Sequence, residues 1–414
     1  MSLEDILITA LMTPVWMRGK ILTRYKRSWG LPIVLRGNPG GGKSTKIDEI
    51  GERLEMMVCT FAVETADTED FDGLVVKTPD GKLQRLSDNE DMLTMMQVGE
   101  GIVFLDETNT PSTRSLGAAL NRVLLDRLWL KKRMPPGIRV LGAMNPPHLS
   151  AGGKPLAAST LNRICLLDAP SISRRAYNDY VNTDLPEEDA KRPPKLDVRE
   201  QLLNGWAENF AHISSLVEAY METSPGSLEQ VPTEDKVHLN RPYPTARSWH
   251  ASQNFLVTSR CLGLLTREDE LEVISGCLGE GVATEFHRYM RSADLPSVKD
   301  VLSRKWRPST TTRTDVMYAV TVACLRHLKS PAFLAADAAI RESMAFGALS
   351  FCKDLVDLQM KDVCYDVYEF LTSHGFGLRY ALMAKTDQQK ALSTIIRDVS
   401  ASYDIRTYRQ ADAS

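Results

Sequence analysis

The residues whose types and spacing most clearly allow chemistry form one continuous phosphate-binding pattern. They are Gly37, Asn38, Pro39, Gly40, Gly41, Gly42, Lys43 and Ser44, followed by Thr45. The pattern is G-x-x-x-x-G-K-S, in which glycines let successive backbone N–H groups turn toward an anion. The lysine of such a loop reaches the outer phosphates of a nucleotide, and the serine hydroxyl binds Mg²⁺. The alternative is a glycine-rich turn without a ligand.

Two acids at the end of an apolar run offer the groups that hydrolysis needs. Asp106 and Glu107 directly follow Gly101–Leu105. Asp106 would hold Mg²⁺, directly or through water, and Glu107 would orient and deprotonate an attacking water. Adjacent strand residues point to opposite sides, so one acid can face the metal while the next reaches the water. Taken alone, the segment also fits a strand followed by a solvated acidic turn.

A third polar residue, Asn145, ends the apolar run Val140–Met144. From a position beside Glu107, its amide could hydrogen-bond both the water and the γ-phosphate. Because Pro146 follows it, the alternative is that Asn145 belongs to a turn and has no role in chemistry.

A parallel sheet would bring these strand ends to one edge. Leu31–Arg36 predicts a strand before the phosphate loop, and Thr45–Leu54 predicts a helix after it. The remaining predicted elements are strands at 101–105, 138–143 and 163–167 and a helix at 114–127. Because strands and helices alternate from residue 31 to about residue 168, the sequence predicts an α/β class with a P-loop parallel sheet.

Two other segments define the organisation of the chain. Leu74–Arg85 predicts a β-hairpin around Pro79-Asp80-Gly81. A stretch rich in proline and charge predicts a linker, and nearly everything after it is helical in pattern. The predicted segments are a nucleotide-binding α/β domain at 1–183, a linker at 184–196, a helical lid at 197–300 and a helical C-terminal region at 301–414.

The overall composition is that of an ordinary globular protein. The chain has 414 residues, of which 43% are hydrophobic and 25% charged, and a net charge of -3. Its acidic start does not resemble a signal peptide and its apolar runs are too short to span a membrane, so we expect a cytoplasmic protein. The seven cysteines contain no C-x-x-C pair and are expected to be reduced core thiols.

One basic segment allows two interpretations. Arg127–Arg133 surrounds Trp129 with basic residues, a composition found in nucleic-acid contacts. The alternative is a solvated basic loop with Trp129 and Leu130 packed into the fold, which the acidic balance of the chain favours.

In their order, these motifs resemble the AAA+ ATPases, and among them the MoxR group. The resemblance runs from about residue 20 to about residue 300 and includes the hairpin at 74–85, Leu161-Asn162-Arg163 and the segment 244–249. It implies that Asn145 is the sensor 1 residue, that Arg163 is an arginine finger inserted into the neighbouring subunit's site, and that Arg247 is the sensor 2 arginine. Taken alone, the spacing of each arginine favours a surface arginine on a helix.

The sequence departs from the usual pattern of that group at three positions. Gly41 stands where Thr or Ser is usual, Asn38 replaces a common Pro, and Ala246 precedes Arg247 where Pro is commoner. None of these differences removes a catalytic group.

The resemblance implies a function as well as a fold. The implied protein hydrolyses ATP with Mg²⁺, assembles as a ring, with six subunits expected, and remodels a partner protein in a chaperone-like way. It also implies a separate von Willebrand factor A domain protein as that partner, because the sequence contains no D-x-S-x-S pattern. The alternatives are a nucleic-acid translocase or helicase subunit and a scaffold that binds ATP with little turnover. Glu107 argues against the scaffold.

Overall fold

The computed structural model of the chain describes residues 3–15, 28–150, 153–170, 198–233, 241–292, 295–374, 394–395, 397–399 and 401. Its internal contacts divide the chain into two compact units. Unit 1 contains Met1–Asn209 and Gly226–Glu285, and unit 2 contains Phe210–Pro225 and Phe286–Ser414. The predicted segments 1–183, 197–300 and 301–414 stay a prediction, and the predicted linker 184–196 lies outside the described residues.

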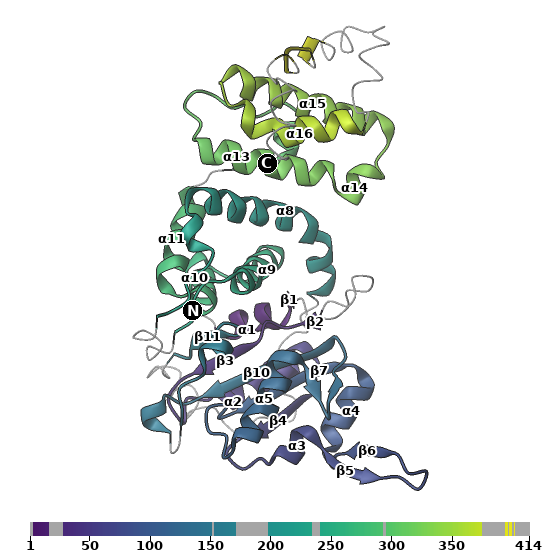
Figure 1. Ribbon diagram of the computed structural model, residues 1–414, viewed down its shortest axis with the longest axis vertical. Helices are drawn as coiled ribbons and strands as arrows, with labels where there is room; N and C mark the ends of the chain where they lie inside the picture. Colours follow the sequence, from purple (N-terminus) through teal and green to yellow (C-terminus); the bar gives the residue numbers. More distant parts are fainter. Residues whose placement is uncertain are drawn as a thin grey trace, which may run out of the picture. The chain divides into compact units, whose positions relative to one another are not determined.

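The first part of unit 1 is an α/β domain (Figure 1). Its elements are α1 (Leu3–Leu11), β1 (Pro14–Val15), β2 (Ser28–Trp29), β3 (Ile33–Arg36), α2 (Lys43–Leu54), β4 (Val58–Ala62), α3 (Thr68–Asp72), β5 (Leu74–Lys77), β6 (Leu83–Leu86), α4 (Glu90–Val98), β7 (Glu100–Asp106), α5 (Arg114–Asp126), β8 (Leu128–Trp129), β9 (Lys132–Arg133), β10 (Gly137–Met144), η1 (Pro147–Leu149), α6 (Ala158–Leu161) and β11 (Cys165–Asp168).

A five-stranded sheet in the order β11-β3-β10-β7-β4 forms the centre of this domain. All four neighbouring strand pairs are parallel. The predicted α/β class with a P-loop parallel sheet is therefore confirmed. Two predicted strands begin two residues too early. The strand predicted at 31–36 begins at Ile33, and Arg163 was placed in the last strand, but β11 begins at Cys165 and Arg163 lies in the turn before it.

Helices cover the sheet because its central strands are mostly apolar toward both sides. In β10, every residue from Ile138 to Met144 is buried. One core cluster joins strand residues such as Val103 and Leu105 to Phe71 of α3, Met92 of α4 and Leu120 of α5. Helix α2 contacts β4 and β7, and α10 (Arg267–Leu278) contacts β11. Such burial on both faces is typical of parallel sheets.

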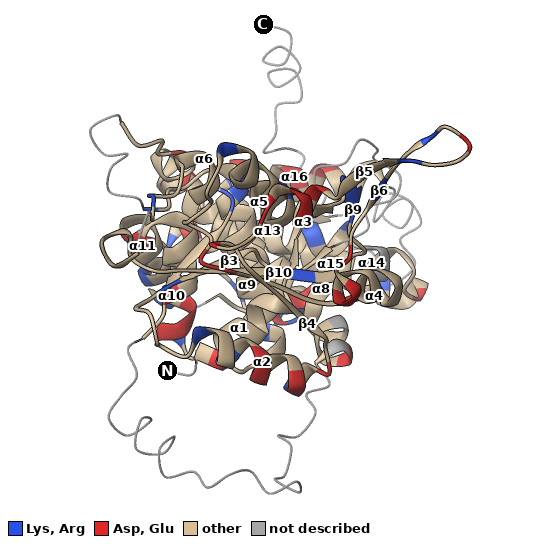
Figure 2. Ribbon diagram, turned by 90° about the horizontal axis from the view of Figure 1, so that it is seen from below, with Lys and Arg blue, Asp and Glu red and all other residues tan. Residues whose placement is uncertain are grey.

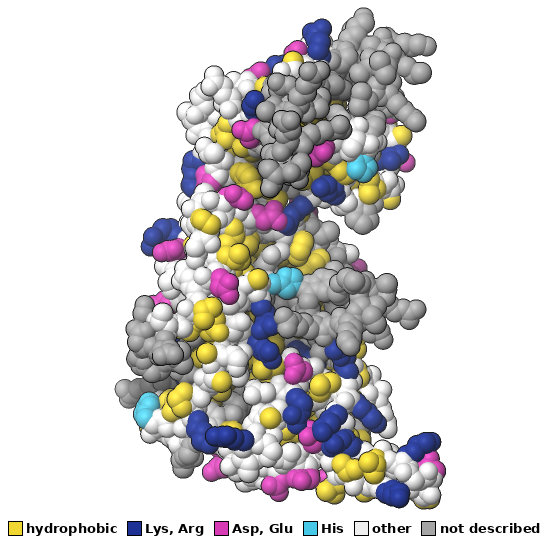
Figure 3. All heavy atoms as spheres, viewed as in Figure 1, with side chains coloured by type: hydrophobic (Ala, Val, Ile, Leu, Met, Phe, Trp, Pro, Cys, Tyr) yellow, Lys and Arg dark blue, Asp and Glu magenta, His cyan; other side chains and the backbone are white. Residues whose placement is uncertain are grey.

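A two-stranded hairpin, β5–β6, extends away from the rest of the α/β domain (Figure 1). Its strands pair antiparallel, with Leu74 opposite Leu86, and its turn contains the acidic Asp80 between basic residues (Figure 2). Leu74 is 61% exposed and Leu83 is 75% exposed, and hydrophobic side chains are visible on this hairpin in Figure 3. The predicted hairpin is therefore present, with its second strand displaced by one residue.

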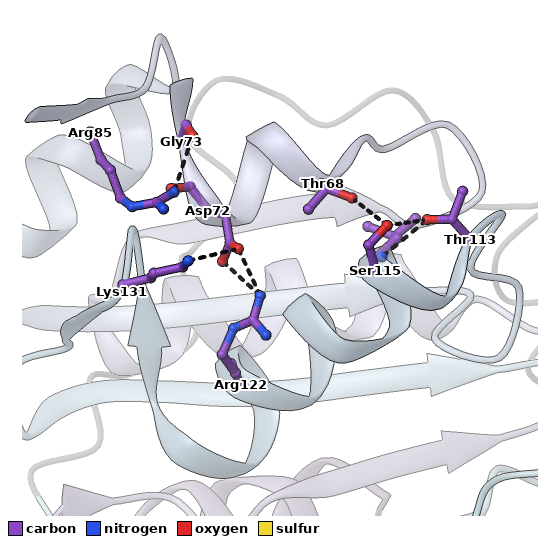
Figure 4. Close-up of polar contacts among 9 residues, drawn as sticks. Thr68, Asp72, Gly73, Arg85, Thr113, Ser115, Arg122 and Lys131 are labelled. Atoms are coloured by element: carbon purple, nitrogen blue, oxygen red, sulfur yellow. Dashed lines mark hydrogen bonds and ion pairs between the residues drawn. The ribbon is translucent and has the colours of Figure 1, made fainter. Parts of the chain in front are cut away.

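The carboxylate of Asp72 fastens the base of this hairpin to the domain (Figure 4). Arg122 Nη2 of α5 donates to both Asp72 oxygens, at 2.9 and 2.8 Å, and Lys131 Nζ lies 3.8 Å from Oδ2. Arg85 of β6 donates to the Asp72 backbone oxygen at 2.6 Å. The hairpin, α5 and the turn between β8 and β9 are thus joined at one residue.

The remaining described elements are helical. They are α8 (Arg199–Thr223), which runs from unit 1 into unit 2, η2 (Pro225–Ser227), α9 (Ala246–Leu262), α10, α11 (Glu280–Ser292), α12 (Val298–Leu302), α13 (Thr314–Leu328), α14 (Pro331–Leu334), α15 (Ala338–Asp357) and α16 (Lys361–Ser373). Unit 2 has an apolar core of its own, which includes Leu302, Val320, Leu349 and Leu371. All seven cysteines are buried, as expected for core thiols. Within the described part of the chain, no helix combines the length and the apolar character that crossing a membrane requires.

Candidate functional site

The phosphate-binding pattern forms an open loop between β3 and α2. Gly40 has φ 72° and Gly42, at the N-cap of α2, has φ 70°, in the left-handed region that side chains other than glycine rarely adopt. Asn38, Pro39, Gly40 and Gly42 are exposed. Because α2 begins at Lys43, the loop backbone and the N-terminus of this helix present N–H groups to the same space. The loop can therefore bind an anion from solvent.

The Lys43 side chain lies along this loop and is 9% exposed. Its Nζ donates to the backbone oxygens of Gly37 and Asn38, at 2.9 and 3.0 Å, and to Asn145 Oδ1 at 3.1 Å. Burial lowers the pKa of Lys43, and the negative charges of Asp106 and Glu107 oppose that shift. The ammonium group thus points toward the ends of β7 and β10.

The two predicted metal ligands are in direct contact. Ser44 Oγ donates to Asp106 Oδ2 at 2.9 Å. A hydroxyl and a carboxylate are oxygen ligands of the kind that Mg²⁺ prefers, so this pair fits the predicted ion. In the ranges that the structure describes, no three His, Cys, Asp or Glu side chains are grouped to hold a metal by themselves. Phosphate oxygens and water would have to complete the coordination of Mg²⁺.

Asn145 bridges the lysine and the predicted base. Its Oδ1 accepts from Lys43, and its Nδ2 donates to Glu107 Oε1 at 3.2 Å. The bridge depends on the sheet: β10 pairs with β3 on one side and with β7 on the other, so Asn145 follows a strand that lies between the other two. The sheet therefore brings together five predicted site residues: Lys43, Ser44, Asp106, Glu107 and Asn145.

Glu107 is held in an unusual backbone conformation directly after β7. Its φ is 56°, and its N–H donates to Asp106 Oδ1 at 3.0 Å. Burial raises the pKa of Glu107, and a hydrogen bond with the side chain of Glu64 raises it further. Glu64 was not predicted. It follows β4, which pairs with β7 so that Ala62 lies beside Asp106, and this strand was missed in the sequence.

Arg163 lies in the turn between α6 and β11. Its side chain is 38% exposed, and its Nη1 is 4.0 Å from Asp126 Oδ1 at the end of α5. An exposed pair of this kind is weak. Arg163 is thus accessible at the surface of unit 1, apart from the bridge between Lys43 and Glu107.

Arg247 is exposed in the first turn of α9. Thr245 caps this helix, and its side chain accepts a hydrogen bond from Ser248 N. Asn162 Nδ2 donates to Thr245 Oγ1 at 2.9 Å. The residue before Arg163 is therefore bonded to the start of the helix that carries Arg247.

The basic segment before β10 forms a small antiparallel pair, β8–β9. Trp129 is 2% exposed and Leu130 6%, and Trp129 Nε1 donates to the Asp70 backbone oxygen at 3.0 Å. Lys131, Lys132 and Arg133 are exposed. Trp129 and Leu130 are packed into the fold as predicted, and the Trp129 ring is not open to stack on a base. Arg127 was expected in the solvated part of the segment, but it is 2% exposed and donates to backbone oxygens of Trp29, Gly30 and Ile138.

Comparisons with known proteins give limited matches. No known protein-family profile matches the sequence. Over 172 residues the chain is 27% identical to midasin of Giardia intestinalis, a match that covers 37% of this chain and 3% of midasin. A solved structure of a candidate ATPase from Cytophaga hutchinsonii has a TM-score of 0.40 and 13% identity, over 63% of this chain and 84% of that one. The chain spans a small part of midasin, and neither likeness identifies the activity of this chain.

Proposed function

We propose that this protein is an AAA+ ATPase of the MoxR type that binds and hydrolyses ATP with Mg²⁺. One observation carries the proposal: a continuous set of hydrogen bonds joins the phosphate loop to the ends of β7 and β10 through Lys43, Asn145 and Glu107. A glycine-rich turn without a ligand would not require a buried lysine, an amide and a carboxylate to converge beside it.

In the proposed reaction each group has a task. Phosphate oxygens would replace the backbone and amide oxygens that Lys43 now contacts, because charged acceptors bind an ammonium group more strongly. Mg²⁺ bound by Ser44 and Asp106 would neutralise charge on the β- and γ-phosphates. Glu107 would take the proton of the attacking water. Asn145 would hydrogen-bond both the Glu107 carboxylate and the γ-phosphate and so keep them correctly placed relative to each other.

The finer parts of the proposal concern assembly and partners. The exposure of Arg163 supports its proposed role as a finger in the site of a neighbouring subunit in a ring, expected to be a hexamer. Arg247 would contact the nucleotide from α9 in its own subunit. A separate von Willebrand factor A domain protein would be the remodelled partner, in the cytoplasm.

Lys43→Ala tests the proposal directly. We expect the purified chain to bind ATP and release phosphate in the presence of Mg²⁺, and Lys43→Ala to lose tight ATP binding in calorimetric titrations. Lys82→Ala is a matched control, because Lys82 is 83% exposed at the hairpin tip, and it should bind ATP like the parent. Unchanged ATP affinity in Lys43→Ala would overturn the proposal.

A nucleic-acid translocase remains the alternative of a different class. The burial of Trp129 counts against it, because a stacking platform needs an open ring face. We expect no DNA stimulation of the ATPase. Stimulation that falls steeply with salt and is weakened by Lys132→Glu would favour the alternative.

A further inference from the structure

Asn109, two residues after Glu107, is buried beside the proposed catalytic groups. It is 2% exposed, and its Nδ2 donates to the backbone oxygen of Asn145 at 3.1 Å. This bond reaches the same residue whose side chain bridges Lys43 and Glu107. Asn109 therefore contacts the backbone from which that bridge extends.

Other bonds fix the turn around Asn109 without reaching Asn145. Thr108 donates to the Ala143 backbone oxygen through its N–H, at 2.8 Å, and through its Oγ1, at 3.0 Å. Thr110 donates to the Glu107 backbone oxygen through its N–H and its Oγ1, at 3.0 and 2.7 Å. Of these neighbouring side chains, the Asn109 amide is the one that reaches Asn145 itself.

Asn109 also contacts the segment that leads to α6. Its backbone oxygen accepts from Lys154 N at 3.0 Å. A Cβ atom on Gly153 would lie 3.0 Å from Asn109 Nδ2, so this glycine packs closely against the amide. The end of β7, Asn145 and the segment before α6 thus meet at Asn109.

The oxygen of the Asn109 side-chain amide indicates that this residue does more than fill space. Its Oδ1 is buried and accepts no hydrogen bond from any described residue. An unsatisfied buried acceptor is unfavourable, and an apolar side chain of similar size would avoid it. The Nδ2 bond to Asn145 offers a reason for an amide at this position.

We propose that Asn109 is a positioning residue that holds Asn145 so that its amide can hydrogen-bond both Glu107 and the γ-phosphate. It would act on the hydrolysis step through Asn145, without touching the nucleotide. This inference rests on the proposed ATPase function.

Asn109→Asp is the most informative variant, because it keeps the size of the side chain and replaces the donor. A carboxylate oxygen would then face the Asn145 carbonyl and repel it. We expect kcat to fall about 10- to 100-fold, as it does when residues that hydrogen-bond metal ligands are replaced, while KM for ATP stays within about threefold. Asn89→Asp is the matched control: Asn89 caps α4 by accepting from Met92 N, a role that a carboxylate retains.

A double-mutant cycle separates positioning from general damage. If Asn109 acts through Asn145, Asn109→Asp should change kcat less than about twofold in an Asn145→Ala background. Losses that multiply, or a kcat of parental size in Asn109→Asp, would overturn the proposal. If Asn109→Asp fails to fold, Asn109→Ala removes the same donor without adding charge and should show the same pattern.

A readout without turnover distinguishes this inference from the proposed function. The side-chain amide signals of Asn145 can be followed by ¹H–¹⁵N NMR in the presence of Mg²⁺ and ADP, with Asn145→Ala to assign them. We expect these signals to shift or broaden in Asn109→Asp and to stay in place in Asn89→Asp. Unchanged Asn145 signals in Asn109→Asp would refute the positioning role even if the chain had no ATPase activity.

Discussion

Glu107→Gln should separate nucleotide binding from hydrolysis. The substitution removes the proposed base but keeps the side-chain length, and it adds no new steric demand on the backbone at this position. A glutamine Oε1 can still accept the hydrogen bond that Asn145 Nδ2 now donates at 3.2 Å. Ser44 and Asp106 are unchanged, so the proposed magnesium ligands remain.

The size of the effect follows from what is lost. General-base catalysis contributes about 10²- to 10⁴-fold, which corresponds to about 3 to 5 kcal/mol of the activation barrier. We therefore expect kcat to fall on the order of a hundredfold or more, with ATP affinity within about threefold of the parent. Phosphate release would give kcat, and calorimetric titration would give the affinity.

The control and the pH dependence make this prediction refutable. Glu90→Gln makes the same chemical change at an exposed residue of α4 and should leave kcat unchanged. Because burial and Glu64 raise the pKa of Glu107, the base becomes protonated at a higher pH than an ordinary carboxyl. The parental kcat should therefore fall as the pH decreases toward that raised pKa, and Glu107→Gln should lack this dependence. A Glu107→Gln kcat within about threefold of the parent would refute the assignment.

Two further predictions test assembly and stability. Arg163→Ala should bind ATP but hydrolyse it poorly; mixing it with Lys43→Ala should partly restore phosphate release, with the gain lost on dilution, and a fully active Arg163→Ala would exclude the finger. Asp72→Ala should lower the free energy of unfolding in urea by about 1 to 2 kcal/mol, because Arg122 loses a partly buried partner. Asp80→Ala removes an exposed pair and should have almost no effect; equal losses in the two variants would contradict the role of Asp72.

The sheet was predictable where polar motifs follow apolar runs. β3, β7 and β10 each end at a motif and are apolar over most of their length, so their type and place were evident. β4 was missed because four of its five residues, Val58 to Ala62, are apolar, so the sequence does not show the alternation of its burial, in which only Cys59 and Phe61 are buried. Without β4, the approach of Glu64 to Glu107 could not be foreseen.

The motifs of the site were predictable, but the contacts between them were not. Residue types identified Lys43, Ser44, Asp106, Glu107 and Asn145 because each has a chemical reason to occur where it does. The bridge through Asn145 depends on the position of β10 between β3 and β7, which no local pattern encodes. The bond from Asn162 to Thr245 likewise joins residues 83 positions apart in the chain.

The exposed side chains of the β5–β6 hairpin have a consequence for the protein in concentrated solution. A two-stranded ribbon has unpaired backbone groups along both outer edges, and Leu74, Val75, Leu83 and Leu86 are between 46% and 75% exposed. Such a ribbon favours nonspecific self-association, which requires no nucleotide and has no fixed number of subunits. Nonspecific self-association would appear as a particle size that grows continuously with protein concentration and decreases when Leu83 is replaced by lysine. A closed ring would keep one size.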